Sequence, residues 1–341
     1  MDFFVLYLLG FCTSLAVTAS VLPLMRKTLG SRLSDKPGGL KKHGQPIPIV
    51  GGSAVFLGIT CSLILIRLCT NFPSGTLHNL RGILIGSLII FAMGLWDDFT
   101  KPRGLPIWAK LALQAAATAA LILYDVRVQA VETLWLAGPL TFLWVVGLTN
   151  AFNLLDIQDG LCVTQALVCT IGLTLITLPH EYIYVNFAAL AVSGACLAFW
   201  PYNQSQTRRT FLGDSGSNLI GFLLAALSLG YGYSAHSSFG FLAPVLILAV
   251  PLFDTAFVML ARILQHKNPL KGSNDHAALR LKSTGWSNRK ILAAFATAGF
   301  VGNFGAFLLT RGGVITTLSV LAGALIACAF LTHKLLQTEP K

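Results

Sequence analysis

Adjacent carboxylates at Asp97 and Asp98 are the first residues in this chain whose types and spacing suggest chemistry. They come directly after an apolar run that ends at Trp96. Two neighbouring carboxylates repel each other unless a cation or a proton lies between them, and their oxygens are ligands that suit a divalent ion. The pair alone leaves a solvated helix terminus open as the alternative.

A second polar segment, residues 150–161, brings two Asn, two Asp and a Gly to the boundary between two long apolar runs. Asn153 and Asp156 are three positions apart and share one face of a helical turn. Gly160, directly after Asp159, can end an irregular stretch or let a ligand approach the backbone closely. By itself the segment is equally consistent with the capping of a helix end.

A third segment, residues 211–218, reads Phe-Leu-Gly-Asp-Ser-Gly-Ser-Asn and precedes another apolar run. If a helix begins here, its free backbone N–H groups form a cradle for an anion. Asp214 would then need a cation nearby, and a metal-bound diphosphate meets both requirements. An isolated Gly-Asp-Ser-Gly is also typical of a turn.

Ionisable residues recur late in the chain. Asp254 lies inside an apolar run, where a charge is costly and favours a functional site, although pairing with Arg262 or a neighbouring helix is the alternative. Residues 273–281 then bring together an acid, His276 and Arg280. The guanidinium group of arginine commonly binds two phosphate oxygens at once, so this loop suggests phosphate binding. The alternative is that the segment forms an amphipathic helix at the membrane interface.

The composition determines which elements must position these groups. Of 341 residues, 55% are hydrophobic and 11% are charged, and the mean hydropathy is +0.71. That is more apolar surface than one water-soluble core could hide. The seven cysteines are scattered without metal-ligand spacing and read as reduced hydrophobic residues. We therefore expect an all-α polytopic membrane protein.

Apolar windows of about 20 residues predict eleven transmembrane helices. With eleven spans, most of the 24 Lys and Arg fall on one side of the membrane, which places the N-terminus outside and the C-terminus in the cytoplasm. The net charge of +11 then reflects topology and does not indicate nucleic acid as a partner. No linker or repeat divides the chain, so we expect one domain over residues 1–341. The runs lie near 3–25, 48–66, 82–96, 107–124, 132–149, 160–178, 184–200, 215–233, 239–262, 291–309 and 313–332.

In this order, the polar segments resemble the polyprenyl-phosphate N-acetylhexosamine-1-phosphate transferases of glycosyltransferase family 4. That family includes the initiators of enterobacterial common antigen, O-antigen and wall teichoic acid, and the translocase of peptidoglycan synthesis. The resemblance runs from about Asp35 to Arg289. The first polar loop is most similar to that of the common-antigen and teichoic-acid initiators. It contains the matching segments Asp35-Lys36-Pro37, Lys41-Lys42-His43 and Pro46 to Gly52.

The resemblance implies transfer of a sugar 1-phosphate, such as N-acetylglucosamine 1-phosphate, from a UDP-sugar to polyprenyl (undecaprenyl) phosphate. It implies Mg²⁺ as the cofactor, with Mn²⁺ as a substitute. Asp97, Asp98 and Asp214 would be the catalytic residues and the metal ligands, with the division of roles between Asp97 and Asp98 open. The substrate-binding residues would be Lys42, Lys101, Lys110, Asn153, Asp156, Asp159, His276 and Arg280.

Two departures from the family pattern stand out. Ile157 replaces the first glycine of the usual Asp-Gly-Xaa-Asp-Gly, which keeps both acids but should change the loop geometry. The histidine cluster of the last large cytoplasmic loop is reduced to His276, which bears on sugar recognition.

The resemblance also implies a bacterial inner membrane protein whose active site faces the cytoplasm; a homodimer is left open. One alternative is transfer of phospho-N-acetylmuramoyl-pentapeptide to the lipid carrier. The other is a secondary transporter, although transporters place their binding acids near the membrane midplane in repeated halves.

Overall fold

The computed structural model describes residues 3–35, 45–70, 74–101, 103–180, 183–230, 232–234, 237–269 and 273–338. The chain forms two compact units, Met1–Tyr231 and Gly232–Lys341, and each is described by itself. The expectation of one domain over residues 1–341 stays a prediction.

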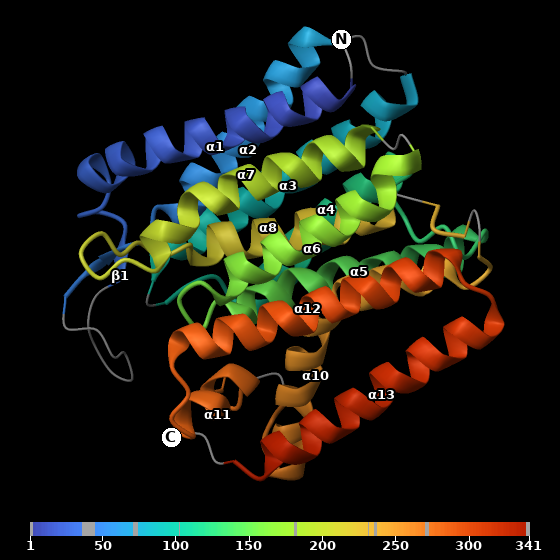
Figure 1. Ribbon diagram of the computed structural model, residues 1–341. Helices are drawn as coiled ribbons and strands as arrows, with labels where there is room; N and C mark the ends of the chain where they lie inside the picture. The colour runs from blue at the N-terminus through green and yellow to red at the C-terminus, as the bar shows by residue number, and fades with distance from the viewer. Residues whose placement is uncertain are drawn as a thin grey trace. The chain divides into compact units, whose positions relative to one another are not determined.

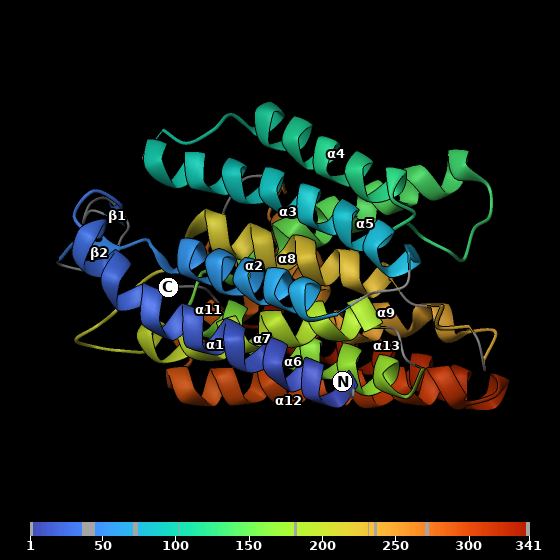
Figure 2. The same cartoon turned by 90° about the horizontal axis from the view of Figure 1, so that it is seen from above.

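Unit 1 is a bundle of helices with one short antiparallel strand pair, in which Ser34 lies opposite Pro48 (Figures 1 and 2). Its long apolar runs form helices because an apolar segment can satisfy its own backbone hydrogen bonds only within a helix when no water is near. The elements are α1 (Phe3–Thr28), β1 (Ser34–Asp35), β2 (Ile47–Pro48), α2 (Gly51–Cys69), α3 (Ser74–Thr100), α4 (Ile107–Leu123), α5 (Leu134–Leu155), α6 (Leu161–Thr177), η1 (Leu178–His180), α7 (Ile183–Asn203) and α8 (Gly213–Leu229).

Helix α8 lies in the interior of unit 1, packed against α2, α3, α5, α6 and α7 (Figure 2). Every residue of α8 is buried except Asp214 in its first turn. A helix that is apolar on all sides is expected in the interior of a bundle. This burial fixes the start of α8, and with it Asp214, relative to the ends of the surrounding helices.

Glycines let α2 and α3 approach the first turn of α8 closely. A Cβ atom at Gly52 would lie 2.3 Å from the backbone nitrogen of Gly216, and one at Gly94 would lie 2.5 Å from the carbonyl oxygen of Asp214. Close backbone approach of this kind is typical of helix packing in membranes. Any larger residue at these two positions would push α2 or α3 away from the turn that carries Asp214.

Unit 2 contains η2 (Gly240–Leu242), α9 (Ala243–Ile247), α10 (Ala249–Leu264), α11 (Ala277–Ser283), α12 (Asn288–Arg311) and α13 (Val314–Leu336). The chain bends by 68° between the η2–α9 segment and α10. Helix α12 packs against α9, α10 and α13. Within α13 only Thr317 and Leu335 are buried, so its many apolar side chains face outward, as lipid-facing residues do.

The helices agree with a protein that crosses a membrane several times. Seven described helices are long and apolar enough to span a bilayer, and the bent pair of η2–α9 and α10 would make an eighth. Helices α4, α6 and α8 have 17 residues each, which is the lower end of the length range of spanning helices. The prediction of an all-α polytopic membrane protein is confirmed, whereas the count of eleven and the orientation stay predictions.

Candidate active site

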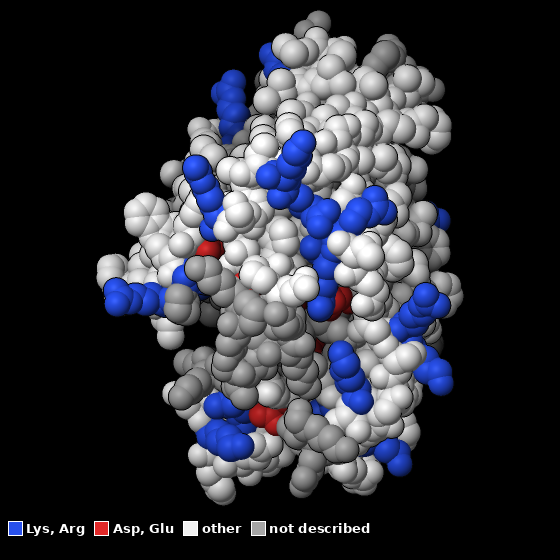
Figure 3. All heavy atoms as spheres, turned by 90° about the vertical axis from the view of Figure 1, so that its left-hand side faces the viewer, with Lys and Arg blue, Asp and Glu red and all other residues white. Residues whose placement is uncertain are grey.

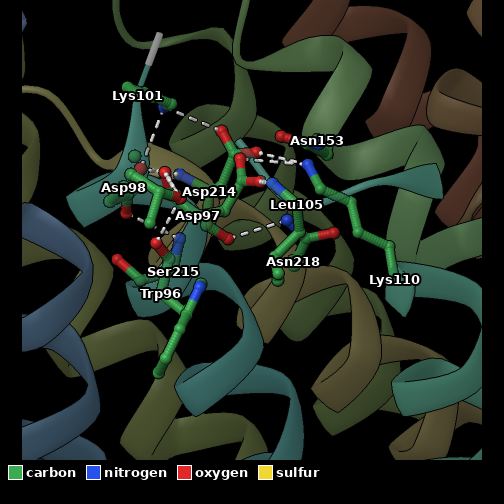
Figure 4. Close-up of polar contacts among 12 residues, drawn as sticks. Trp96, Asp97, Asp98, Lys101, Leu105, Lys110, Asn153, Asp214, Ser215 and Asn218 are labelled. Carbon is green, nitrogen blue, oxygen red and sulfur yellow. Dashed lines mark hydrogen bonds and ion pairs between the residues drawn. The ribbon is translucent and has the colours of Figure 1, made fainter. Parts of the chain in front are cut away.

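Three carboxylates from two helices meet at one end of unit 1. Asp97 and Asp98 lie in the last turn of α3, and Asp214 lies in the first turn of α8. Figure 4 shows these side chains pointing toward one another, with Lys101 and Lys110 beside them. Lys101 follows α3 directly and Lys110 belongs to the first turn of α4. The structure therefore brings together five residues that were predicted for the site.

The two lysines bridge the carboxylates. Lys101 Nζ lies 2.9 Å from Asp98 Oδ1 and 3.0 Å from Asp214 Oδ1. Lys110 Nζ lies 3.0 Å from Asp97 Oδ2 and 3.2 Å from Asp214 Oδ2. The repulsion that three adjacent carboxylates would suffer is thus relieved by two ammonium groups. Both contacts direct Lys101 into the cluster.

Asp98 fixes the start of α8. Its Oδ1 accepts a hydrogen bond from the backbone N–H of Asp214 at 3.0 Å, and its Oδ2 accepts one from Ser215 at 3.0 Å. The first N–H groups of a helix have no partner within the helix, and a carboxylate both satisfies them and interacts favourably with the helix dipole. The anion that these N–H groups bind is therefore Asp98 itself, which corrects the expectation of a free cradle for a ligand at this turn.

Two glycines with positive φ hold the backbone near the carboxylates. Gly213 has φ +77°, and a Cβ atom there would lie 2.6 Å from Asp98 Oδ2. Gly104 has φ +65° and precedes Leu105, whose N–H donates to Asp97 Oδ1 at 2.6 Å. Both positions combine a left-handed conformation with close approach to a carboxylate, and only glycine tolerates that combination without strain.

The electrostatics of the cluster favour the charged forms of Asp214 and Lys101. Burial would raise the pKa of Asp214, but the ammonium groups of Lys101 and Lys110 outweigh burial and lower this pKa to about 2. Burial would lower the pKa of Lys101, but the charges of Asp98 and Asp214 outweigh it and raise this pKa above its usual value. Both residues consequently stay ionised across the neutral range.

The last turn of α5 and the loop that follows it contribute the next group of predicted residues. Asn153 Oδ1 accepts a hydrogen bond from Ser217 Oγ at 2.9 Å, which ties the end of α5 to the first turns of α8. Burial, together with the negative charge of Asp214, raises the pKa of Asp156 well above its usual range. A cation bound near Asp156 would stabilise its ionised form.

Asp159, the other acid of this loop, forms an ion pair with Arg209 in the segment between α7 and α8. Gly160 has φ +83°, and its backbone N–H donates to Asn203 Oδ1. Arg209 and Asn203 were not predicted for the site, and Ser217 belonged to the third polar segment without a role of its own. The signal that could have found Arg209 is a basic residue five positions before Asp214.

In unit 2, a histidine and an aspartate form a buried pair. His276 Nδ1 lies 2.7 Å from Asp254 Oδ2, and Asp254 Oδ1 accepts the backbone N–H of Ala277 at 2.9 Å. The charge of Asp254, which sequence alone could match with Arg262, is therefore paired with His276. This carboxylate orients the imidazole in the way that buried acids orient functional histidines.

Arg280 is occupied by contacts within unit 2. Its Nη2 lies 2.8 Å from Asp275 Oδ1, and its Nη1 donates to the carbonyl oxygens of Leu335, at 3.1 Å, and Thr338. The guanidinium thus holds the end of α13 to the segment before α11. These contacts favour a positioning role for Arg280, and substrate binding by this residue stays a prediction. Lys42, the remaining predicted site residue, lies outside the described residues.

Basic residues lie close in sequence to the helix ends that carry the carboxylates: Arg103 comes shortly after α3, and Arg208 and Arg209 come shortly before α8. Figure 3 shows exposed Lys and Arg side chains around small areas of Asp or Glu. Anionic molecules are concentrated at such a surface by its electrostatic potential. In the described part of the chain, no three His, Cys, Asp or Glu side chains form a ready metal-binding group.

Comparison with known proteins gives a consistent picture. The family model for glycosyl transferase family 4 matches residues 80–232, which include all three carboxylates and both lysines. The chain is 27% identical to the probable undecaprenyl-phosphate N-acetylglucosaminyl 1-phosphate transferase of Bacillus subtilis (strain 168), over 92% of this chain and 87% of that protein.

Two further relatives carry the names of other transferases, one for decaprenyl phosphate and one for phospho-N-acetylmuramoyl-pentapeptide. The decaprenyl-phosphate N-acetylglucosaminephosphotransferase of Mycobacterium tuberculosis (strain ATCC 25618 / H37Rv) is 28% identical, over 85% of this chain and 79% of the relative. The phospho-N-acetylmuramoyl-pentapeptide-transferase of Lactiplantibacillus plantarum (strain ATCC BAA-793 / NCIMB 8826 / WCFS1) is 30% identical, over 76% of this chain and 83% of the relative.

Proposed function

The chain belongs to glycosyl transferase family 4, and from this premise we propose that it transfers a sugar 1-phosphate from a UDP-sugar to polyprenyl phosphate. The proposed donor is UDP-N-acetylglucosamine and the proposed acceptor is undecaprenyl phosphate, because a relative that aligns with 92% of the chain bears the name of that transferase. The products would be UMP and a diphosphate-linked lipid that initiates a glycan.

The convergence of Asp97, Asp98 and Asp214 with two lysines is the observation that carries this proposal. Both reactants are anions, so a site that joins them needs positive charge placed in advance. Lys101 and Lys110 are held at their positions by carboxylates, and their ammonium groups can turn toward phosphate oxygens when substrates enter. The site thus supplies charge stabilisation that is already organised before the reactants bind.

The residues present fit a divalent ion. Lys110 Nζ lies within 3.2 Å of both Asp97 Oδ2 and Asp214 Oδ2, so these two oxygens surround one position that favours positive charge. Carboxylate oxygens are the ligands that Mg²⁺ prefers. Asp97 and Asp214 would hold the ion, which supplies Lewis-acid stabilisation of phosphate charge when bound. The choice of Mg²⁺, with Mn²⁺ as a substitute, is part of the proposal.

The roles of the two adjacent aspartates follow from their contacts. Both oxygens of Asp98 accept backbone N–H groups of α8, so we assign Asp98 to positioning Asp214. Asp97 would remove the proton of a monoprotonated polyprenyl phosphate. The freed oxygen attacks the β-phosphorus of the UDP-sugar, the bond from that phosphorus to the bridging oxygen breaks, and UMP leaves with the bond electrons. Asn153, Asp156 and Asp159 would face the nucleotide.

We place the reaction at the cytoplasmic face of the bacterial inner membrane, where a nucleotide sugar and a membrane lipid can meet. The basic residues close to the helix ends that carry the carboxylates support this orientation, since cytoplasmic loops are enriched in Lys and Arg. Modification of cysteines introduced singly at exposed Arg103 and exposed Gln129 in intact cells would test it. Protection of the first and labelling of the second is the expected result.

The test of function is a donor panel with membranes that contain the full chain. We expect UMP release, and label in an organic-extractable lipid, from UDP-N-acetylglucosamine in the presence of Mg²⁺. Asp214→Asn should lower turnover about a thousandfold, because it removes a ligand of the ion that would stabilise the charge of the transition state. Asp125→Asn, which changes an exposed acid paired with His78, is the control and should leave turnover unchanged.

A second donor is favoured by one observation, the similarity to the phospho-N-acetylmuramoyl-pentapeptide-transferase of Lactiplantibacillus plantarum. The same panel separates the two donors. UMP release from UDP-N-acetylmuramoyl-pentapeptide alone would replace the N-acetylglucosamine assignment, and release from neither donor would contradict the proposed reaction.

A further inference from the structure

Two loops of unit 1 are tied to each other beside the carboxylate cluster. One is the loop of residues 156–160 between α5 and α6, and the other is the segment of residues 204–212 between α7 and α8. Arg209 Nη2 pairs with Asp159 Oδ2 across them. The carbon at the centre of the Arg209 guanidinium also lies 5.2 Å from the ring centroid of Phe211, within the range of a cation–π contact.

Asn203 provides a second tie between the same loops. This last residue of α7 is 2% exposed, its Oδ1 accepts the backbone N–H of Gly160, and its Nδ2 donates to the carbonyl oxygen of Thr210 at 3.1 Å. Asn203 thus joins the residue after Asp159 to the residue after Arg209. The two side chains of the ion pair are presented to each other by a buried amide that holds both backbones.

The ion pair between Arg209 and Asp159 is better explained by its effect on the orientation of Asp159 than by a contribution to folding stability. The side chains of Arg209 and Asp159 are 39% and 24% exposed, and ion pairs with this much solvent contribute little to folding. Arg209 Nε is buried and has no partner in the described part of the chain, which opposes stability further. Its guanidinium nevertheless holds the carboxylate of Asp159 in one direction, in the loop that also carries Asp156.

We propose that Arg209 is a positioning residue for the donor nucleotide, which acts by holding Asp159 and the 156–160 loop in the binding conformation. This inference rests on the proposed function, in which the loop faces the nucleotide. Arg208, its neighbour, is the matched control, because its guanidinium lies 5.4 Å from the ring centroid of Tyr202 instead. The two arginines are adjacent, equally charged and differ in what they hold.

The experiment compares Arg209→Gln, Arg209→Lys and Arg208→Gln in the purified full chain. The KM for UDP-N-acetylglucosamine, the KM for polyprenyl phosphate and kcat are measured separately, and thermal unfolding is followed for each variant. For Arg209→Gln we expect the KM of the nucleotide sugar to rise about tenfold with kcat kept within about twofold, the pattern of lost binding shared by ground state and transition state. Arg209→Lys should recover most of the loss, and Arg208→Gln should match the wild type.

A double-mutant cycle with Asp159→Asn separates positioning from direct contact with the substrate. If Arg209 acts through Asp159, the double variant should resemble Asp159→Asn alone, because the partner is already lost. If the increases in the KM of the nucleotide sugar in the two single variants multiply in the double variant, Arg209 works independently of Asp159 and the inference is overturned. An unchanged KM in Arg209→Gln would also overturn it.

Two further results complete the test. A fall in kcat and in unfolding temperature together, without rescue by lysine, would show a structural role and contradict the inference. Absence of UMP release in the wild type would instead count against the proposed function. The two failures are therefore distinguishable in one set of assays.

Discussion

Asp98→Asn tests whether this carboxylate fixes the start of α8. The asparagine has nearly the same shape but only one acceptor oxygen, whereas Asp98 accepts backbone N–H groups from both Asp214 and Ser215 at 3.0 Å. Its NH₂ group would therefore face a backbone N–H, and one buried donor would lose its acceptor. The charge that faces Lys101 Nζ at 2.9 Å disappears as well.

The expected loss in the free energy of unfolding of Asp98→Asn follows from these contacts. The hydrogen bond that keeps an acceptor loses about 1 kcal/mol because that acceptor is no longer charged, and the orphaned buried donor costs about 1–3 kcal/mol, so we expect a loss of about 2–4 kcal/mol. For a unit of this size the unfolding temperature should then fall by about 5–10 °C. Asp97→Asn is the matched control, because Asp97 accepts one backbone N–H, from Leu105, and an asparagine can keep that acceptor.

The assay follows unfolding by intrinsic tryptophan fluorescence in detergent, with UMP release measured on the same preparations. Asp98→Asn should lose both stability and turnover, whereas Asp97→Asn should lose turnover with a fall in unfolding temperature no more than about half as large. Equal unfolding temperatures for Asp98→Asn and the wild type, or a larger fall for Asp97→Asn, would refute the assignment of Asp98 to positioning.

Three other predictions concern the same site. Gly213→Ala should lower turnover at least about a hundredfold, because φ is +77° there and the new Cβ atom would lie 2.4 Å from Ile49 Cγ2 and 2.6 Å from Asp98 Oδ2. Gly138→Ala, where a Cβ atom meets nothing within 4 Å, should be neutral in the same assay. Removal of divalent ions with EDTA should abolish UMP release, and added Mg²⁺ should restore it; activity that survives EDTA would count against the ion. The folded pKa of Asp214 is lowered to about 2, so its contribution to stability is present above its unfolded value and is lost as pH falls toward 2. In melting curves of ion-free protein, the unfolding temperature should therefore not fall between pH 8 and pH 5 on account of Asp214. If it does fall over that range, and the fall is absent in Asp214→Asn, the lowered pKa of Asp214 is contradicted.

Local signals in the sequence were sufficient for part of the site. The pair Asp97 and Asp98 at the end of an apolar run, and Asp214 in a short Gly-Ser-rich segment, could be identified because acids at helix ends are visible without knowledge of packing. Their convergence could be inferred only through the resemblance to a family. The division between a positioning role for Asp98 and a reacting role for Asp97 depends on hydrogen bonds to a helix more than a hundred residues away.

The amino-acid sequence by itself determined a polytopic helical protein and the residue types of its site. An apolar run about 20 residues long specifies a helix through its own backbone hydrogen bonds, without reference to any neighbour. Tertiary structure alone decided that α8 is the buried helix, that Asp98 occupies its N-terminus, and that Arg209 meets Asp159. The physical reason is that the helices around α8 are apolar on most sides, so hydrophobicity cannot select which faces meet. That choice was made by close contacts at glycines and by a few buried polar groups, which become neighbours only when the chain is packed.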